Sequence, residues 1–144
     1  MPNMTGHFTG RSTMQTVFSL HDTTDHEMSI MEVRGLQNSS DDNWKDTKIT
    51  YWGTADLIRG CGAEHGYFVE DHANGDRDFG TFEGKLSSAN GQATIEGTYR
   101  YTNGTGKLAG ISGSGKFKGR LTSPTEIEMS WEGSYQLAAG TRAA

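Results

Sequence analysis

Apolar and polar residues alternate along most of the chain, with the period of two that is typical of half-buried β-strands. Between residues 126 and 135 every second position faces one side, and these positions carry Ile127, Met129, Trp131, Gly133 and Tyr135. The positions between them are glutamate or serine. No window of ten residues shows the period of an amphipathic helix, so the pattern predicts an all-β protein.

The alternating segments are short and are separated by turn signals. The turns are marked by Asn-Gly at 74–75, 90–91 and 103–104 and by Ser-Pro at 123–124. A polar loop is expected over 37–46, with Trp44 covering a barrel mouth. Eight or nine antiparallel strands with regular turns are typical of a barrel or a sandwich. The predicted strands are 5–11, 13–20, 26–36, 47–58, 64–73, 77–86, 93–101, 111–121 and 126–135.

The glycines inside the predicted strands favour a barrel over a sandwich. The run GISGSGKF at 110–117 has the spacing of a phosphate-binding loop, but Phe117 stands where that loop needs a serine or threonine. The segment also alternates like a strand. Glycines on an inward face let strands bend sharply and leave room for a ligand or a large side chain. The sequence therefore predicts a single small antiparallel eight-stranded β-barrel over 1–138, with a flexible tail at 139–144.

Two stretches resemble a known family. The run TNGTGKLAGISGSGKFKG at 102–119 and the run DHANGDRDFGTFEGKL at 71–86 resemble the allene oxide cyclase barrel-like superfamily, over about residues 71–137. The resemblance implies an eight-stranded barrel with an apolar cavity, in homodimers or homotrimers. Plant members cyclise a fatty-acid epoxide without a cofactor. No binding residue of the plant enzymes is carried over, and a different substrate is expected here.

The net charge, the apolar runs and the cysteine count limit the classes of function that the chain can have. The formal net charge of −5 argues against a general binder of nucleic acid or of anionic membranes. No apolar run is long enough to cross a bilayer, and the polar N-terminus does not read as a secretory signal, so a cytoplasmic protein is expected. The single cysteine excludes an internal disulfide and a cysteine-based zinc cluster. Neither a cofactor nor a metal is expected.

The densest set of reactive side chains lies in 61–72. Alternation places Gly66, Phe68, Glu70 and His72 on one face of this segment. Either face suits the interior by pattern alone. We favour the face of Glu70 and His72, because Phe68 beside a glycine suits a cavity wall; a surface position for these groups is the alternative.

Other candidates come from the neighbouring strands. Glu32 lies among apolar residues and is expected to be a buried acid, with an ion pair to Arg34 as the alternative. Tyr99 lies on an apolar face, where its hydroxyl can orient a polar ligand. The predicted catalytic residues are Glu32, Glu70, His72 and Tyr99, and the predicted ligand-binding residues are Phe68, Phe82, Tyr101, Met129 and Trp131.

These residues favour an enzyme. We expect a cofactor-independent isomerase or cyclase, or a lyase that removes water, acting on a small hydrophobic or aromatic metabolite of secondary metabolism inside the barrel. The mechanism expected is positioning with acid–base help. The alternatives are a lipocalin-like carrier of a hydrophobic molecule and a structural oligomer whose barrel is filled by its own side chains.

Overall fold

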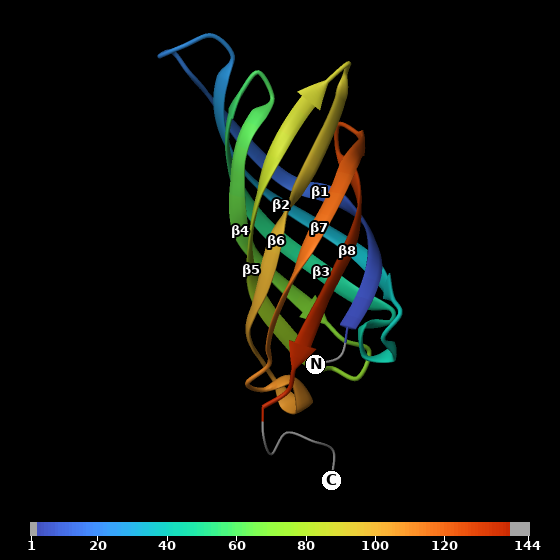
Figure 1. Cartoon of the computed structure of the whole chain (residues 1–144). Helices are drawn as coiled ribbons and strands as arrows, with labels where there is room; N and C mark the ends of the chain where they lie inside the picture. Colours follow the sequence, from blue (N-terminus) through green and yellow to red (C-terminus); the bar gives the residue numbers. More distant parts are fainter. Residues whose placement is uncertain (1–2, 139–144) are drawn as a thin grey trace.

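The chain forms a closed barrel of eight antiparallel strands in a computed structural model that describes residues 3–138. Each strand pairs with its neighbours in chain order, and β1 closes the barrel against β8 (Figure 1). The all-β, eight-stranded barrel predicted from the alternation is confirmed, and the predicted tail at 139–144 lies outside the described residues. The strands are β1 (Asn3–Leu20), β2 (His26–Ser39), β3 (Thr47–Ile58), β4 (Cys61–Asp71), β5 (Arg77–Ala89), β6 (Gln92–Gly104), β7 (Ser112–Ser123) and β8 (Glu126–Gln136).

The first strand joins two predicted segments. Residues 5–11 and 13–20 form one strand, β1, with a bulge between Ser12 and Met14. Because Thr13 is an extra residue opposite β2, it inverts the alternation. Before the bulge the even-numbered side chains face the interior, and after it they face outward.

Three of the four predicted turns lie between strands. The pairs at 74–75 and 90–91 and the Ser-Pro pair at 123–124 each connect antiparallel neighbours. At 74–75 the second residue, Gly75, has a φ of 91°, a left-handed conformation that glycine adopts without strain. The register of β4 against β5 follows from this turn.

The turn predicted at 103–104 is wrong, because β6 continues through Gly104. The side-chain oxygen of Asn103 accepts hydrogen bonds from the backbone N–H groups of Gly104 and Gly110, at 2.8 and 2.9 Å. Asn103 therefore organises the loop that follows it, which contains the short 3₁₀ helix η2 (Gly106–Leu108).

One end of the barrel is closed by a plug. The other 3₁₀ helix, η1 (Asp42–Trp44), comes between β2 and β3. It places Trp44 over this mouth, as the sequence predicts. Trp44 is fully buried, and its ring centroid lies 4.4 Å from that of Tyr135. The Tyr135 hydroxyl donates a hydrogen bond to Asp41, which caps η1.

The described residues contain no helix with the length and apolar character that a membrane span requires.

Aromatic rings fill the barrel by lying over glycines of adjacent strands. Phe68 on β4 is the register partner of Gly80 on β5, where a Cβ atom would overlap the Phe68 ring. The Tyr99 hydroxyl lies in the same way against Gly115 and Gly133. These glycines therefore set how much aromatic volume the interior accepts.

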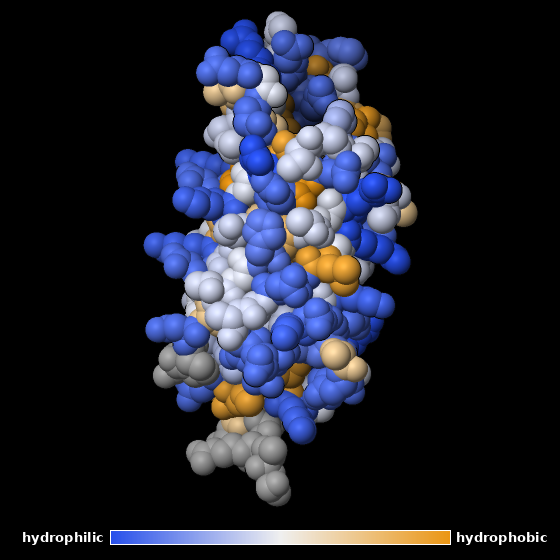
Figure 2. Space-filling model, turned by 90° about the vertical axis from the view of Figure 1, so that its right-hand side faces the viewer, coloured by the Kyte–Doolittle hydropathy of each residue, from blue (hydrophilic) through white to orange (hydrophobic). Residues whose placement is uncertain are grey.

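The outer surface is uneven in character. Hydrophilic side chains cover most of the face in Figure 2, interrupted by separate hydrophobic patches. Exposed large apolar side chains concentrate on the first strands of the sheet. They are Met14, Val17 and Phe18 on β1, Met28, Ile30 and Leu36 on β2, Trp52 and Ile58 on β3, and Tyr67 on β4.

Replacing an inward glycine should destabilise the barrel. In Gly115→Ala the added methyl group overlaps the Tyr99 hydroxyl and the Glu132 carbonyl oxygen, and we expect a loss of about 1–3 kcal/mol in the free energy of unfolding. Ser114→Ala, one position away on the outer face, should change it by less than about 0.5 kcal/mol. Urea unfolding measures both; equal values for the two variants would contradict this packing.

Candidate functional site

The barrel encloses a cavity of about 90 Å³ with mostly aromatic walls. Tyrosine, phenylalanine and tryptophan side chains from seven of the strands make most of its surface, and polar groups reach it at a few points only. The lining residues are Phe8, Gln37, Ile49, Tyr51, Glu64, Phe68, Glu70, Phe82, Ile95, Tyr99, Tyr101, Phe117, Met129 and Trp131.

Most of the predicted site residues converge on this cavity. Glu70 and Tyr99, of the predicted catalytic residues, line it. So do all five predicted ligand-binding residues: Phe68, Phe82, Tyr101, Met129 and Trp131. The structure therefore places the favoured face of β4 inside, as expected. His72 is also buried, directly behind the cavity wall.

Glu32 is the exception, because the expectation that it lies inside the barrel is wrong. Its face of β2 is the outer one, where Met28 and Ile30 are also exposed. The carboxylate accepts hydrogen bonds from the Thr13 hydroxyl at 2.8 Å and from the Trp52 indole N–H at 2.8 Å. These bonds, that of Thr13 first, hold the pKa of Glu32 below its usual value. Arg34 adds the ion pair that the sequence left as the alternative.

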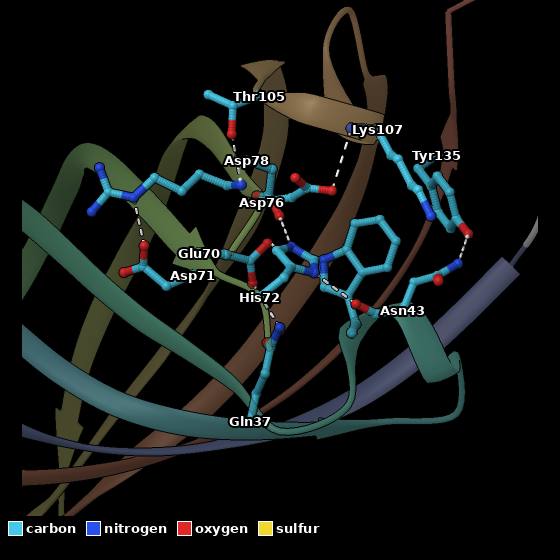
Figure 3. A network of polar contacts seen from close by, with 12 residues as sticks. Gln37, Asn43, Glu70, Asp71, His72, Asp76, Asp78, Thr105, Lys107 and Tyr135 are labelled. Atoms are coloured by element: carbon cyan, nitrogen blue, oxygen red, sulfur yellow. Dashed lines mark hydrogen bonds and ion pairs between the residues drawn. The ribbon is translucent and has the colours of Figure 1, made fainter. Parts of the chain in front are cut away.

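A chain of buried polar groups lies at the plugged end of the cavity (Figure 3). The turn at 74–75 sets Glu70 on β4 directly opposite Asp78 on β5. The same turn returns His72 to Asp78, with 2.6 Å between its Nε2 and Asp78 Oδ2. The three titratable groups are 9% exposed or less, and Asp78 is wholly buried. We call Glu70, His72 and Asp78 the buried triad.

Neutral donors and acceptors hold the buried triad in place. The backbone carbonyl of Asn43 lies 2.6 Å from His72 Nδ1, and because a carbonyl only accepts, Nδ1 carries a proton. The Glu70 carboxyl accepts from Gln37 Nε2 at 2.8 Å and from Trp44 Nε1 at 3.2 Å. The plug thus orients both ends of the triad.

Burial changes the protonation of the two acids. Desolvation raises the pKa of Asp78 to about 7. Desolvation, with the neighbouring Asp78 charge as the second cause, also raises the pKa of Glu70 well above its usual value. Two facing carboxyls in a dry interior cannot both ionise cheaply, so they share a proton near neutral pH. The triad is therefore able to release or take up a proton at the cavity wall.

A second buried acid faces the cavity. Glu64 on β4 is 3% exposed, and burial raises its pKa to about 7. Unlike Glu70, it receives no hydrogen bond from the described residues. It lies six residues before Glu70 on the same face of the strand, a distance of about 20 Å along an extended chain. Glu64 and Glu70 therefore mark two different parts of the interior.

Sequence reasoning did not select Glu64, Asp78 or Gln37 as site residues, although signals for them exist. Asp78 shares a face of β5 with Gly80 and Phe82, and the three-residue turn 73–75 pairs it with Glu70. Glu64 shares the parity of Glu70 along β4. Gln37 was assigned to a polar loop, but β2 continues to Ser39 and carries it inside.

The site carries no arrangement for a metal ion in the described residues, where no three histidine, cysteine or acidic side chains are grouped for one. Comparison with protein-family models, with curated proteins and with solved structures finds no match for the chain. The resemblance to the allene oxide cyclase barrel-like superfamily therefore stays a prediction, and the chemistry of the site has to be argued from its geometry.

The buried acids should make stability fall as the pH rises. Folded Glu64 keeps its proton up to a pKa of about 7, whereas the unfolded group loses it near 4.5. The folded state therefore binds more protons between these values, and the free energy of unfolding decreases across the interval. For a shift of this size the contribution of Glu64 is about 3 kcal/mol.

The variant Glu64→Gln isolates this contribution. Between pH 5 and pH 8 its free energy of unfolding should fall by about 2.5 kcal/mol less than that of the wild type, because the other titrating groups are common to both. Urea unfolding at the two pH values gives the four numbers needed. Parallel pH profiles in the two proteins would show that Glu64 is not protonated by burial.

Proposed function

We propose that the barrel is a cofactor-independent isomerase, cyclase or dehydrating lyase for a small molecule bound in the cavity. The observation that supports this most is the buried triad, whose one end, Glu70, lines the cavity. A proton at this position is shielded from water, and burial raises the pKa of Asp78 beside it to about 7. General acid–base catalysis needs these two properties together.

The proposed chemistry needs no redox partner. In an isomerisation, the Glu70 carboxylate takes a proton from one carbon and returns it to another as the double bond moves. In a dehydration it takes the proton beside a C–O bond, the C–H electron pair becomes the new double bond, and the oxygen leaves. Glu70, the member of the triad that lines the cavity, passes this proton to the leaving hydroxide, which departs as water, and Glu70 becomes a carboxylate again. Both reactions leave the oxidation level of the protein unchanged.

The size of the cavity limits the substrate. An engineered protein cavity of about 150 Å³ holds benzene, and the cavity here is about 90 Å³. A ligand that fits without displacing side chains therefore has only a few non-hydrogen atoms. A long-chain fatty-acid epoxide requires several inward rings to move, which weighs against the reaction of the plant cyclases.

The aromatic walls support a second candidate, a carrier. Apart from Gln37, Glu64 and Glu70, the cavity is lined by apolar and aromatic side chains, which retain a hydrophobic molecule without transforming it. A carrier binds its ligand and returns it intact. An enzyme releases a product of equal mass, or of the mass less one water.

The two candidates separate when the purified protein is incubated with a pool of small alkenols, hydroxyketones, epoxides and aromatic compounds, followed by chromatography with mass detection. For the enzyme we expect a new compound, and Glu70→Gln should lower its rate of formation about 100- to 10,000-fold because the group that takes up and returns the proton is lost. Glu132→Gln, the same change on the exposed outer face, is the matched control.

Ligand retention should survive in Glu70→Gln, because the amide keeps the shape of the side chain. Circular dichroism of both variants checks that the barrel is intact. Retention of an unchanged compound by all three proteins would support the carrier. Turnover that is equal in wild type and Glu70→Gln would exclude Glu70 from the chemistry.

A further inference from the structure

The Glu64 carboxyl is an acid of the interior that no side chain or backbone group of the described residues holds by a hydrogen bond. It is 3% exposed, lines the cavity and receives no hydrogen bond from the described residues. In the buried triad, by contrast, Glu70 is held by Gln37 and Trp44. Since a buried carboxyl without a partner is costly, such a group calls for a ligand that pairs with it.

The surroundings of Glu64 offer it no positive charge. No lysine, arginine or histidine is among the residues that line the cavity in the described part of the chain. Tyr51, from β3, is the titratable group that Glu64 influences, and it is neutral and 6% exposed. The Phe82 ring packs edge to face on Tyr51, at 5.3 Å between centroids. The faces of such rings carry negative potential and attract cations.

We propose that the cavity binds a small organic cation, an amine or a quaternary ammonium of a few non-hydrogen atoms, as an ion pair with Glu64. The ammonium neutralises the carboxylate, and its methyl groups contact the aromatic walls. A neutral ligand leaves Glu64 unpaired, and an anion is repelled by it. The inference rests on the cavity of the proposed function and names the chemical class of its ligand.

Binding of a cation is coupled to the proton on Glu64. At pH 6 the carboxyl is protonated, so the entering cation must displace a proton; at pH 8 the carboxylate is already formed. The Kd should therefore be about tenfold weaker at pH 6 than at pH 8, with close to one proton released at the lower pH. Glu70, the member of the buried triad on β4, lies six residues after Glu64. The variant Glu64→Gln, used in the test that follows, leaves the acids of the triad unchanged.

The probe is tetramethylammonium, with 2-methylpropan-2-ol as the neutral molecule of similar shape. Isothermal titration calorimetry in two buffers of different ionisation enthalpy gives both the Kd and the number of protons released. We expect the wild type to bind the cation at least tenfold more tightly than the alcohol at pH 8. Glu64→Gln should lose this preference and the pH dependence, whereas Glu132→Gln should keep both.

Two results would overturn the proposal: equal binding of the cation and the alcohol by the wild type, or unchanged cation binding by Glu64→Gln. Neither decides the proposed function. If a neutral compound is turned over in a Glu70-dependent manner while the cation fails to bind, the enzyme stands and the ligand class falls. If the cation binds as expected and nothing is turned over, the ligand class stands and the enzyme falls.

A different observation concerns the outside of the barrel. The pairing of β1 with β8 ends at Arg11, and beyond the bond from Ser12 N to Thr125 O no described backbone group pairs with the outer edge of Thr13–Leu20. Met14 and Phe18 on this segment are 65% and 69% exposed. A long, exposed and apolar edge without charges is a template for another strand, and proteins usually protect such edges.

We infer that this edge pairs antiparallel with the same segment of a second copy of the chain. Antiparallel self-pairing follows a two-fold axis, which uses up both edges at once. A register centred on Thr16 sets Met14 against Phe18 of the second copy on the shared outer face. Because the segment is uncharged, no like charges meet, and the apolar residues Met28 and Ile30 on β2 extend the contact beyond the edge.

Sedimentation equilibrium over a range of protein concentrations tests the dimer. We expect a wild-type dimer, a monomer for Phe18→Lys, and a dimer for Leu36→Lys, whose side chain is also exposed and apolar but lies far from the free edge. A monomeric wild type at about 100 μM, a trimer, or a dimer that survives in Phe18→Lys would each overturn the inference, because edge pairing about a two-fold axis closes at two copies.

Discussion

The packing of aromatic rings over glycine backbone is the interaction on which the rest of this structure depends. A barrel of eight strands has an interior that side chains just fill. Here the filling is done by rings that lie across neighbouring strands, where Gly80, Gly115 and Gly133 leave the space. The small volume that remains is therefore a consequence of ring packing, and so is the burial of the acids beside it.

The burial of these acids explains the electrostatics of the site. Glu64, Glu70 and Asp78 are surrounded by rings and backbone in place of water, so each is easier to protonate than in solution. The plug completes this environment, because Trp44 closes the mouth and donates a hydrogen bond to Glu70. Closure of the barrel and activation of its acids are thus one physical effect.

Much of the fold was predictable because a period of two is read directly from the sequence. The alternation identified the strands, and the pair at 74–75 located the turn between β4 and β5. The register that places residue 70 opposite residue 78 depends on the three-residue length of that turn, which the pair alone does not give. The face of β2 was assigned wrongly because apolar residues are not always inward: Met28 and Ile30 gave Glu32 apolar neighbours on the outer wall. Alternation separates two faces but does not state which of them meets water.

Gln37 and Trp44 illustrate a second limit. A stretch rich in serine, asparagine and aspartate predicts a loop, yet it contains both residues that hold Glu70. Their role depends on where the loop folds back, which is set by contacts with Tyr135 and His72 far along the chain. Local composition carries no record of such contacts.

The bulge at Thr13 gives β1 a different tolerance to changes in length and in composition. A substitution in β1 alters one side chain, whereas an insertion or deletion exchanges the inward and outward sets from that point to the next compensating irregularity. Thr13 is itself such an irregularity, so even-numbered side chains of β1 face inward before it and outward after it. Removing this one residue would join the two halves into a regular strand with Ser12 still inward and Met14 and Phe18 still outward, so β1 should tolerate at Thr13 a deletion that would invert the strand at other positions.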